Sequence, residues 1–577
     1  MKKSVIYVML FILLTFSVLS ATKEGNMKLL AVSNPGEEYS RGTIATLHLE
    51  IEEGQGRVFM DSYPLSKIDT QISTRFAKEV ACNFIEVDCN KYNFFYTIRS
   101  NSAVIGGPSA GAAISILTIS VLEDLPIDES ISITGTINTG GIIGPVGSIL
   151  PKTKGAGLNG EITKVLIPKY TDINGTNLTE YEELYNIKVI EVSHLTDAVY
   201  EFTGKDYKNY DNLELSDSYA DTMGQISNNM CDRAQGLALQ VYKEDENITA
   251  INLLKRGKES LKLNAYYSAA SFCFGSGLNA RNKIIQEQNL NPNNIMLKIN
   301  ETYEQTVDYL EYIKSFSLKT LTDLETYMAV TDRIFESQER LQTSIEHLQN
   351  NNTNASIFEL GYAIERFHSA RTWAEFFGTK CKEFKFNKHS LDESCLKKIS
   401  EVEERIQYID LFLPSSTDGA RESVTKAYQE YNSDNPEVCL YEASIAKARI
   451  DLLLNSMTLD PDYVDDVIED RLGLVKSIIA KQNSKGIFPI VAYSYYEYAD
   501  ALKETDKYSS LLYLGYALEL ANMDIYFEKK EIEFPRFTTE QLLIFGFGFA
   551  TGLIIVSLSF MLIEKRKKKV HFKHKKS

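Results

Sequence analysis

The sequence predicts an α+β domain that is followed by an all-α helical array and a C-terminal transmembrane helix. Strand-like and helix-like patterns alternate up to about residue 205. Turn-forming residues then thin out, and apolar residues recur at spacings of three and four from about 206 to 535. A final run, 542–563, is apolar and carries no charge. The 577 residues, 44% of them hydrophobic, suffice for two or more cores.

The α+β domain is predicted over residues 27–203 from its local patterns. Apolar residues occupy every second position from Ala45 to Ile51, which indicates a half-buried strand. Further elements follow in chain order: a helix over 71–84, a strand over 130–136 and a strand over 164–167. This alternation of strands and helices indicates a mixed domain.

The helical array is predicted over residues 206–535, where four stretches of small residues look alike. They are Ser268-Ala269-Ala270, Gly361-Tyr362-Ala363, Ser444-Ile445-Ala446 and Gly515-Tyr516-Ala517. Small residues let two helices approach closely, so we expect divergent repeats of helical hairpins. The spacing between the stretches is too irregular to name a repeat family.

A serine and a lysine stand out within the α+β domain. Ser109 lies in the run Gly-Gly-Pro-Ser-Ala-Gly over 106–111, and Lys152 follows 43 positions later. A serine hydroxyl needs a base to take its proton when it attacks a carbonyl. A lysine serves only when neutral, and burial can lower its pKa of about 10.4 by roughly 3 to 5 units. Alone, Ser109 is more often a helix cap and Lys152 a surface charge, but together they favour catalysis.

The neighbours of this pair fit the same chemistry. Thr134 lies between them in the sequence, and its hydroxyl can orient an amine. An apolar wall around the lysine is expected from Ile142, Ile143, Val146, Ile149 and Leu150. Pro108 is suited to the first position of a helix over 110–122, which places Ser109 at a helix N-terminus. Gly107, Pro108 and Ala110 would then form the loop whose amides face a developing oxyanion.

Ser109, Thr134 and Lys152, in this order and spacing, resemble the proteolytic domain of the Lon family of Ser-Lys peptidases over roughly 27–203. The resemblance implies a serine endopeptidase with Ser109 as nucleophile, Lys152 as general base and Thr134 as the supporting hydroxyl. Lys154 is the rival base, but its distance from the serine fits the family pattern less well. The chain looks like the predicted secreted or membrane-anchored archaeal Lon-like proteases that have no ATPase module.

The chain departs from the family pattern at three positions. Gly106 stands where an acidic residue is common, Thr136 replaces the usual Glu after Thr-Gly, and Ser148 replaces a second Gly after Pro-x-Gly. These changes leave the dyad intact and concern instead the substrate preference and the conformation of the active-site loop. No Walker A string occurs in the sequence, so we expect hydrolysis without ATP.

Cofactors and metals have no support in the sequence, because the seven histidines are scattered without paired spacing. The expected partners are polypeptide substrates. An alternative from another class is a cell-surface scaffold in which the Lon-like module binds without catalysis. A third hypothesis is self-processing of a loop of the same chain.

Both ends of the chain carry targeting signals. Residues 1–21 have the basic start, short apolar run and small-residue end of a signal peptide. The run over 542–563 is about 33 Å long as a helix, enough for a bilayer core of about 30 Å. The tail over 564–577 holds eight Lys or Arg and one Glu, which predicts a cytoplasmic side. We therefore expect a single-pass protein of the cell membrane with its N-terminal part outside.

Charge and cysteine content bound the partners further. The net charge is −17, and with +2 in residues 1–21 and +7 in the tail, −26 remains for residues 22–563, which disfavours nucleic acid. Gly548-x-x-x-Gly552 is compatible with a homo-oligomer of membrane helices. Seven cysteines leave at least one unpaired. Cys82 with Cys89, and Cys381 with Cys395, are near enough in sequence to close small loops, but the connectivity stays open.

Overall fold

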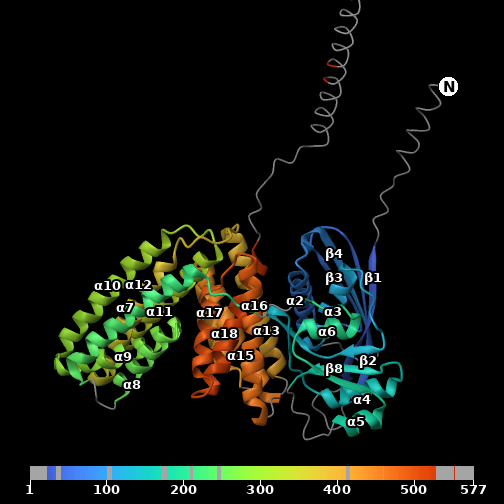
Figure 1. The fold of residues 1–577 in the computed structure, drawn as a ribbon, viewed down its shortest axis with the longest axis horizontal. Coiled ribbons are helices and arrows are strands. Elements are labelled where there is room, and N and C mark those ends of the chain that lie inside the picture. Colours follow the sequence, from blue (N-terminus) through green and yellow to red (C-terminus); the bar gives the residue numbers. More distant parts are fainter. Residues whose placement is uncertain are drawn as a thin grey trace, which may run out of the picture. The chain divides into compact units, whose positions relative to one another are not determined.

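The fold is described from a computed structural model. It describes residues 22–33, 41–100, 107–169, 178–207, 212–243, 248–410, 413, 416–458 and 461–527, together with Gly552 and Val556. Residues up to Glu528 form one compact unit, which contains every element named below. In Figure 1 the strands carry the blue and teal colours of the N-terminal third, and the green-to-orange remainder is helical.

A seven-stranded mixed sheet organises the N-terminal part. Its order is β3-β4-β2-β1-β5-β8-β9, and β6 and β7 form a separate antiparallel hairpin. The strands are β1 (Lys23–Ser33), β2 (Arg41–Glu53), β3 (Val58–Tyr63), β4 (Tyr92–Ser100), β5 (Ile131–Ile133), β6 (Thr136–Asn138), β7 (Ile142–Gly144), β8 (Lys164–Pro168) and β9 (Lys188–Val192). β1 pairs antiparallel with β2 and parallel with β5, so it joins the two halves of the sheet.

Helices cover both faces of this sheet. They are α2 (Ile68–Ile85), α3 (Gly111–Leu122), α4 (Ile149–Asn159), α5 (Leu178–Tyr185) and α6 (Leu195–Thr203). Successive residues of one strand enter different cores: Leu29 packs with α2, α3 and α6, whereas Leu30 packs with α4. Period-two alternation therefore buries both faces of the strands beneath helices.

The strand predicted from Ala45 to Ile51 is confirmed within β2, and the helix over 71–84 lies in α2. The strand predicted over 130–136 is interrupted. It ends at Ile133, and β6 begins at Thr136. The interruption has a physical cause, because Gly135 exchanges backbone hydrogen bonds with the start of α3 instead of a neighbouring strand.

From residue 217 to 527 the described residues are almost entirely helical. The helices are α7 (Asp217–Val241), α8 (Thr249–Lys262), α9 (Tyr266–Glu287), α10 (Pro292–Lys314), α11 (Leu321–Gln349), α12 (Thr353–Trp373), α13 (Lys388–Asp410), α14 (Asp418–Asn432), α15 (Pro436–Thr458), α16 (Val464–Ser484), α17 (Ile490–Leu502) and α18 (Lys507–Ala521). Short 3-10 turns also occur: η1 (Cys89–Lys91), η2 (Pro108–Ala110), η3 (Thr139–Gly141), η4 (Ala374–Phe376), η5 (Pro461–Tyr463) and η6 (Met523–Tyr526).

These helices pack as four successive bundles of three, and in each bundle the second and third helices, which are consecutive in the sequence, pack on one another. The bundles are α7–α9, α10–α12, α13–α15 and α16–α18, and within each the third helix packs against both others. The four small-residue stretches lie in the third helices, α9, α12, α15 and α18. They meet in pairs, since α9 packs on α12 and α15 packs on α18.

The four bundles form two halves of the same design, the first half α7–α12 and the second half α13–α18, drawn green to yellow and yellow to orange in Figure 1. A disulfide joins the first and third helices at the start of each half, Cys231–Cys273 in one and Cys395–Cys439 in the other. Cys82–Cys89 forms as the sequence spacing allows, but Cys381 is a free thiol and does not pair with Cys395.

Each half also buries one glutamate between two basic residues. Arg233 and Arg281 donate to Glu365 in the first half. Lys398 and Lys447 donate to Glu519 in the second half. The positions correspond: both glutamates come four residues after the glycine of the small-residue stretch, and the third-helix cations both come eight residues after the third-helix cysteine.

The prediction of a transmembrane helix and of a single-pass membrane protein is wrong for the part of the chain that the structure describes. No helix there is both long enough and apolar enough to cross a membrane, because charged residues interrupt the long helices. Within 542–563 only Gly552 and Val556 are described. The rest of that run, the predicted signal peptide 1–21 and the tail 564–577 lie outside the described residues.

Candidate active site

Ser109 lies in η2, the 3-10 turn that leads directly into α3. Gly107, before this turn, has a φ of 97°, a left-handed conformation that glycine adopts without strain. Pro108 then occupies the first position of the turn, where a missing N–H is tolerated. Ser109 and Ala110 are half-buried, and they belong to the first turn, whose amides have no partner four residues earlier.

Lys152 projects from α4 into the protein interior. Its side chain is buried, with 5% of the residue exposed, and its Nζ donates a hydrogen bond of 3.0 Å to Thr134 Oγ1. Thr134 is itself fully buried, immediately after β5. Burial lowers the pKa of the Lys152 amine from its ordinary value of 10.5 to about 7. Close to neutral pH, a large fraction of this amine is therefore uncharged.

The backbone connects the lysine partner to the serine turn. The Gly135 amide donates to the Ser109 carbonyl at 3.0 Å, and the Ala112 amide donates to the Gly135 carbonyl at 3.1 Å. Two backbone bonds thus fix the residue after Thr134 against the turn that carries Ser109. Lys152 donates to Thr134 and not to the Ser109 hydroxyl. Catalytic hydrogen bonds commonly tighten only when a substrate binds, so this geometry is compatible with a Ser-Lys pair.

The position of α4, and so of Lys152, is set by close backbone packing on β2. A Cβ atom on Gly155 would lie 2.6 Å from the Gly42 carbonyl carbon, so neither position has room for a side chain. Ser148 precedes α4 with a φ of 59°, and its carbonyl accepts from the Lys152 amide. The left-handed conformation at Ser148 explains why glycine suits this position.

The apolar wall expected around Lys152 is divided among three cores. Val146 and Ile149 pack with α4 against the sheet, whereas Ile142 and Ile143 belong to the other two large clusters. Leu150 is half-buried. The desolvation of the amine therefore arises from the whole junction between α4, the sheet and the β6–β7 hairpin.

Lys154, the rival base, is exposed and lies beside the ring of Tyr185, 5.8 Å from its centroid. Lys152 is the buried lysine that donates to Thr134, so the geometry favours Lys152. Thr136, which stands where the family has Glu, is fully buried at the start of β6. In place of a carboxylate, this position therefore holds an uncharged side chain that solvent does not reach.

Two further residues hold the β6–β7 hairpin and were not singled out from the sequence. His194 accepts from the Thr196 amide through Nδ1, so its Nε2 donates to the Gly140 carbonyl at 2.7 Å. Burial lowers the pKa of His194 to about 4, which keeps it neutral in this role. Arg405, from α13, donates to the Ile137 carbonyl and to Asn138 Oδ1. In the sequence, Arg405 gave no signal of this contact, because most charged residues in a helical region are exposed to solvent.

One segment of the chain, which contains these residues, is similar in sequence to known proteins. Residues 90–202 match the model of the Lon protease (S16) C-terminal proteolytic domain, a span that contains Ser109, Thr134 and Lys152. The archaeal Lon protease of Halobacterium salinarum is 29% identical over 102 residues, 18% of this chain and 14% of that protein. Lon protease 2 of Bacillus subtilis is 41% identical over 64 residues, 11% of each chain.

A third relative, the archaeal Lon protease of Methanothermobacter thermautotrophicus, is 33% identical over 104 residues, 18% of this chain and 16% of that protein. The chain therefore spans less than a fifth of the length of these relatives. The similarity is confined to the proteolytic domain, and it supports a serine peptidase of the Lon type in this part of the chain.

Proposed function

We propose that this chain is a serine endopeptidase that hydrolyses peptide bonds of polypeptide substrates, with Ser109 as nucleophile and Lys152 as general base. The observation that carries the proposal is the buried Lys152 amine, whose pKa is lowered to about 7 and which donates to Thr134. A lysine whose pKa lies close to 7 is partly uncharged at physiological pH and can then accept a proton. A solvated lysine has no such capacity.

The proposed reaction divides the work among three side chains. Lys152 accepts the Ser109 proton while the serine oxygen attacks the substrate carbonyl, and the resulting ammonium returns the proton to the leaving amine. Thr134 accepts a hydrogen bond from Lys152 and so directs the nitrogen lone pair. Water then hydrolyses the acyl-enzyme with Lys152 again acting as base.

The first turn before α3 is proposed as the oxyanion site. Amides at the start of a helix point toward a common location and favour negative charge. The left-handed Gly107 lets the backbone approach a substrate there. Ser109 would thus present its hydroxyl beside the amides that stabilise the oxyanion.

We further propose that this chain hydrolyses peptides without ATP. Its 577 residues contain no G-x-x-x-x-G-K-[ST] phosphate-binding string. Unfolded polypeptides would be cleaved directly, whereas compact folded proteins would resist.

Active-site labelling tests this function directly. The full chain is incubated with a fluorophosphonate probe and, separately, with an unfolded protein substrate in the absence of nucleotide. We expect Ser109 to be labelled and the substrate to be cleaved, with both activities rising with pH through about 7 as Lys152 loses its proton. Ser109→Ala and Lys152→Met should each abolish cleavage, and Lys154→Met serves as the matched control.

Cleavage that persists in Ser109→Ala or Lys152→Met would contradict the assigned roles. A folded chain that neither reacts with the probe nor cleaves any substrate would instead favour a non-catalytic binding module. Intact mass before and after incubation separates cleavage of other proteins from self-processing.

A further inference from the structure

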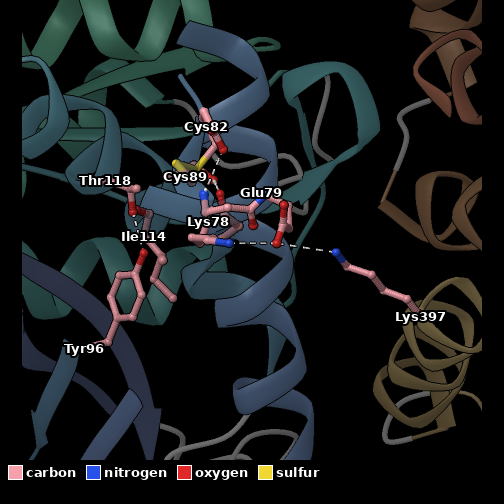
Figure 2. Close-up of a disulfide and its surroundings, with 12 residues drawn as sticks. Lys78, Glu79, Cys82, Cys89, Tyr96, Ile114, Thr118 and Lys397 are labelled. Carbon is pink, nitrogen blue, oxygen red and sulfur yellow. Dashed lines mark hydrogen bonds and ion pairs between the residues drawn. A yellow bond between two sulfur atoms is a disulfide. The ribbon is translucent and has the colours of Figure 1, made fainter. Parts of the chain in front are cut away.

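One helix of the second half, α13, packs against three elements of the proteolytic part. It lies beside η2, which carries Ser109, and beside α2. Figure 2 shows the contact with α2, where Lys397 reaches Glu79 from the helical side and Lys78 reaches the same carboxylate from within α2. Burial opposes ionisation there, but the two lysines hold the pKa of Glu79 below its usual value. The contact is therefore ionic and only half-buried, with the side chains of Lys397 and Glu79 33% and 29% exposed.

The third contact of α13 is made by Arg405, which is 3% exposed. Its Nη2 donates to the Ile137 carbonyl at 2.9 Å and to Asn138 Oδ1 at 2.7 Å. Its Nε donates to Asp451 Oδ1 of α15 at 3.1 Å. One rigid guanidinium thus joins β6 to two helices of the second half.

Strand β6 is directly coupled to the candidate site. It begins one residue after Gly135, which bonds to Ser109, and two residues after Thr134, which bonds to Lys152. A Cβ atom on Gly111 would lie 3.1 Å from the Ile137 amide nitrogen, so the start of α3 packs closely against β6. A displacement of Ile137 would therefore be felt by both candidate catalytic residues.

Comparison of the two halves shows that Arg405 is not part of the common helical design. It follows Lys398 by seven residues. The residue seven after Arg233 in the first half is Gln240, which is exposed and whose side-chain amide donates to the Gly236 carbonyl. Its partner Asp451 follows Lys447 by four residues, where the first half has the apolar Ile285. At the two positions compared, the described part of the first half therefore holds no such ion pair.

We propose that Arg405 is a positioning residue for the Ser109–Lys152 site, through which the second helical half completes the active geometry. This inference rests on the proposed function. Arg405 holds Ile137 and Asn138 so that Thr134 and Gly135 stay aligned with the lysine and the serine. The proteolytic site is therefore competent only while α13 is docked on β6.

Conservative substitution in the full chain tests the proposal. An ammonium cannot reach Ile137, Asn138 and Asp451 together, so Arg405→Lys should lower kcat at least tenfold with KM within twofold. Hydrogen exchange of the amides in 135–144 should rise in the same variant. Arg449→Lys is the matched control, since Arg449 bonds to Tyr516 and Ser423 within the second half. It should leave kcat and this exchange within twofold of the wild type.

A second variant keeps the proposal testable if Arg405→Lys folds poorly. Asn138→Ala removes one acceptor and leaves the charge pair of Arg405 intact, and it should lower kcat by a smaller factor. In the double variant the two losses should not multiply, because both break one contact. Equal losses in Arg405→Lys and Arg449→Lys, or wild-type kcat in a folded Arg405→Lys, would overturn the proposal.

Failure of the proposed function is distinguishable from failure of this inference. If Ser109 in the wild type does not react with the fluorophosphonate probe, the peptidase assignment fails. The exchange of 135–144 then still decides whether Arg405 positions β6. Unchanged exchange in Arg405→Lys refutes the positioning role whether or not the chain is a peptidase.

Discussion

Two buried lysines, one in each region of the molecule, have opposite protonation behaviour. Lys152 in the proteolytic part is 5% exposed and Lys398 in the helical part is 0% exposed. Burial lowers the pKa of Lys152 to about 7. Burial acts the same way on Lys398, but the carboxylates of Glu401 and Glu519 outweigh it and raise its pKa. The presence of a carboxylate partner, and not burial, decides whether a buried lysine is a structural cation or a potential base.

The two halves of the helical array extend this comparison. Glu519 lies between two fully buried lysines, which lower its pKa to about 2 against the opposing effect of burial. Glu365 lies between Arg233 and Arg281, whose side chains are 30% and 22% exposed. The same arrangement is therefore sealed from water next to the proteolytic part and partly hydrated in the first half.

Removal of the two equivalent glutamates, one at a time, should reveal the largest difference in stability between the two halves. Glu519→Ala leaves Lys398 and Lys447 buried without this partner, and we expect it to lower the free energy of unfolding by about 3–5 kcal/mol. Glu365→Ala leaves two arginines that water can reach, and we expect a loss of about 1–3 kcal/mol. Urea denaturation of both variants measures the difference. Equal losses would mean that the sealed environment of Glu519 has no energetic consequence.

A carboxylate placed beside Lys152 should raise its pKa, so that Lys152 becomes a permanently charged lysine like Lys398. Thr134→Asp puts an acid at the position that now receives the Lys152 hydrogen bond. The pKa of Lys152 should rise from about 7 to above 9, which lowers the uncharged fraction at pH 7 from about one half to about one hundredth or less. Labelling of Ser109 at pH 7 should therefore fall at least about fiftyfold, about 2.3 kcal/mol in activation free energy. Thr134→Ser keeps the hydroxyl and serves as control. A labelling rate in Thr134→Asp equal to that of the control would refute the base role.

Lys152 should destabilise the fold that contains it. The unfolded lysine, with an ordinary pKa of 10.5, holds its proton more tightly than the folded one, at about 7. The free energy of unfolding of the wild type should therefore rise with pH between 7 and 10.5. At pH 6 the folded chain holds a charged, buried Lys152, and the full pKa difference corresponds to about 5 kcal/mol. The methionine recovers only part of this, so Lys152→Met should stabilise the chain by about 2 kcal/mol at pH 6. Thermal unfolding across pH should show the gain shrinking toward pH 10, and a constant gain would contradict this account.

Ser148→Gly should have the smallest effect. It tests whether the backbone at the start of α4, and not only the groups around Lys152, sets the pKa of that lysine. Relief of the left-handed conformation at Ser148 should stabilise the chain by about 1 kcal/mol. Because the glycine leaves the surroundings of Lys152 unchanged, the apparent pKa of Ser109 labelling should stay near 7. A shift in that pKa would show that the start of α4 tunes the base.

Local patterns predicted the elements that position the site. The strand through Ala45 follows from period-two alternation, the helix in α2 from helical spacing of apolar residues, and the strand at β8 from a short continuous apolar run. All three patterns are local properties of the sequence. The motif also identified Ser109, Thr134 and Lys152, and the structure joins Lys152 to Thr134 by a hydrogen bond. Their catalytic roles stay predictions.

Long-range partners could not be predicted, because helical periodicity says which face is buried and not what it meets. Cys395 lies near Cys381 in sequence, yet its helix packs on α15 and the disulfide forms with Cys439. From the sequence alone, Arg405 is expected to be an exposed charged residue among polar neighbours. Its partner Ile137 is 268 positions away. Lys398 likewise looks like a surface residue until Glu519 is brought beside it.

The backbone contact between Gly42 and Gly155 limits how this protein can vary. Because no side chain intervenes there, no rotamer change can absorb an added methyl group, and any substitution at either position must push α4 off the sheet. If the proposed function holds, a random-mutagenesis screen for inactive chains would recover changes at these two glycines as readily as changes at Ser109. Sequence diversity in related proteins would accordingly be lowest along this seam between helix and strand.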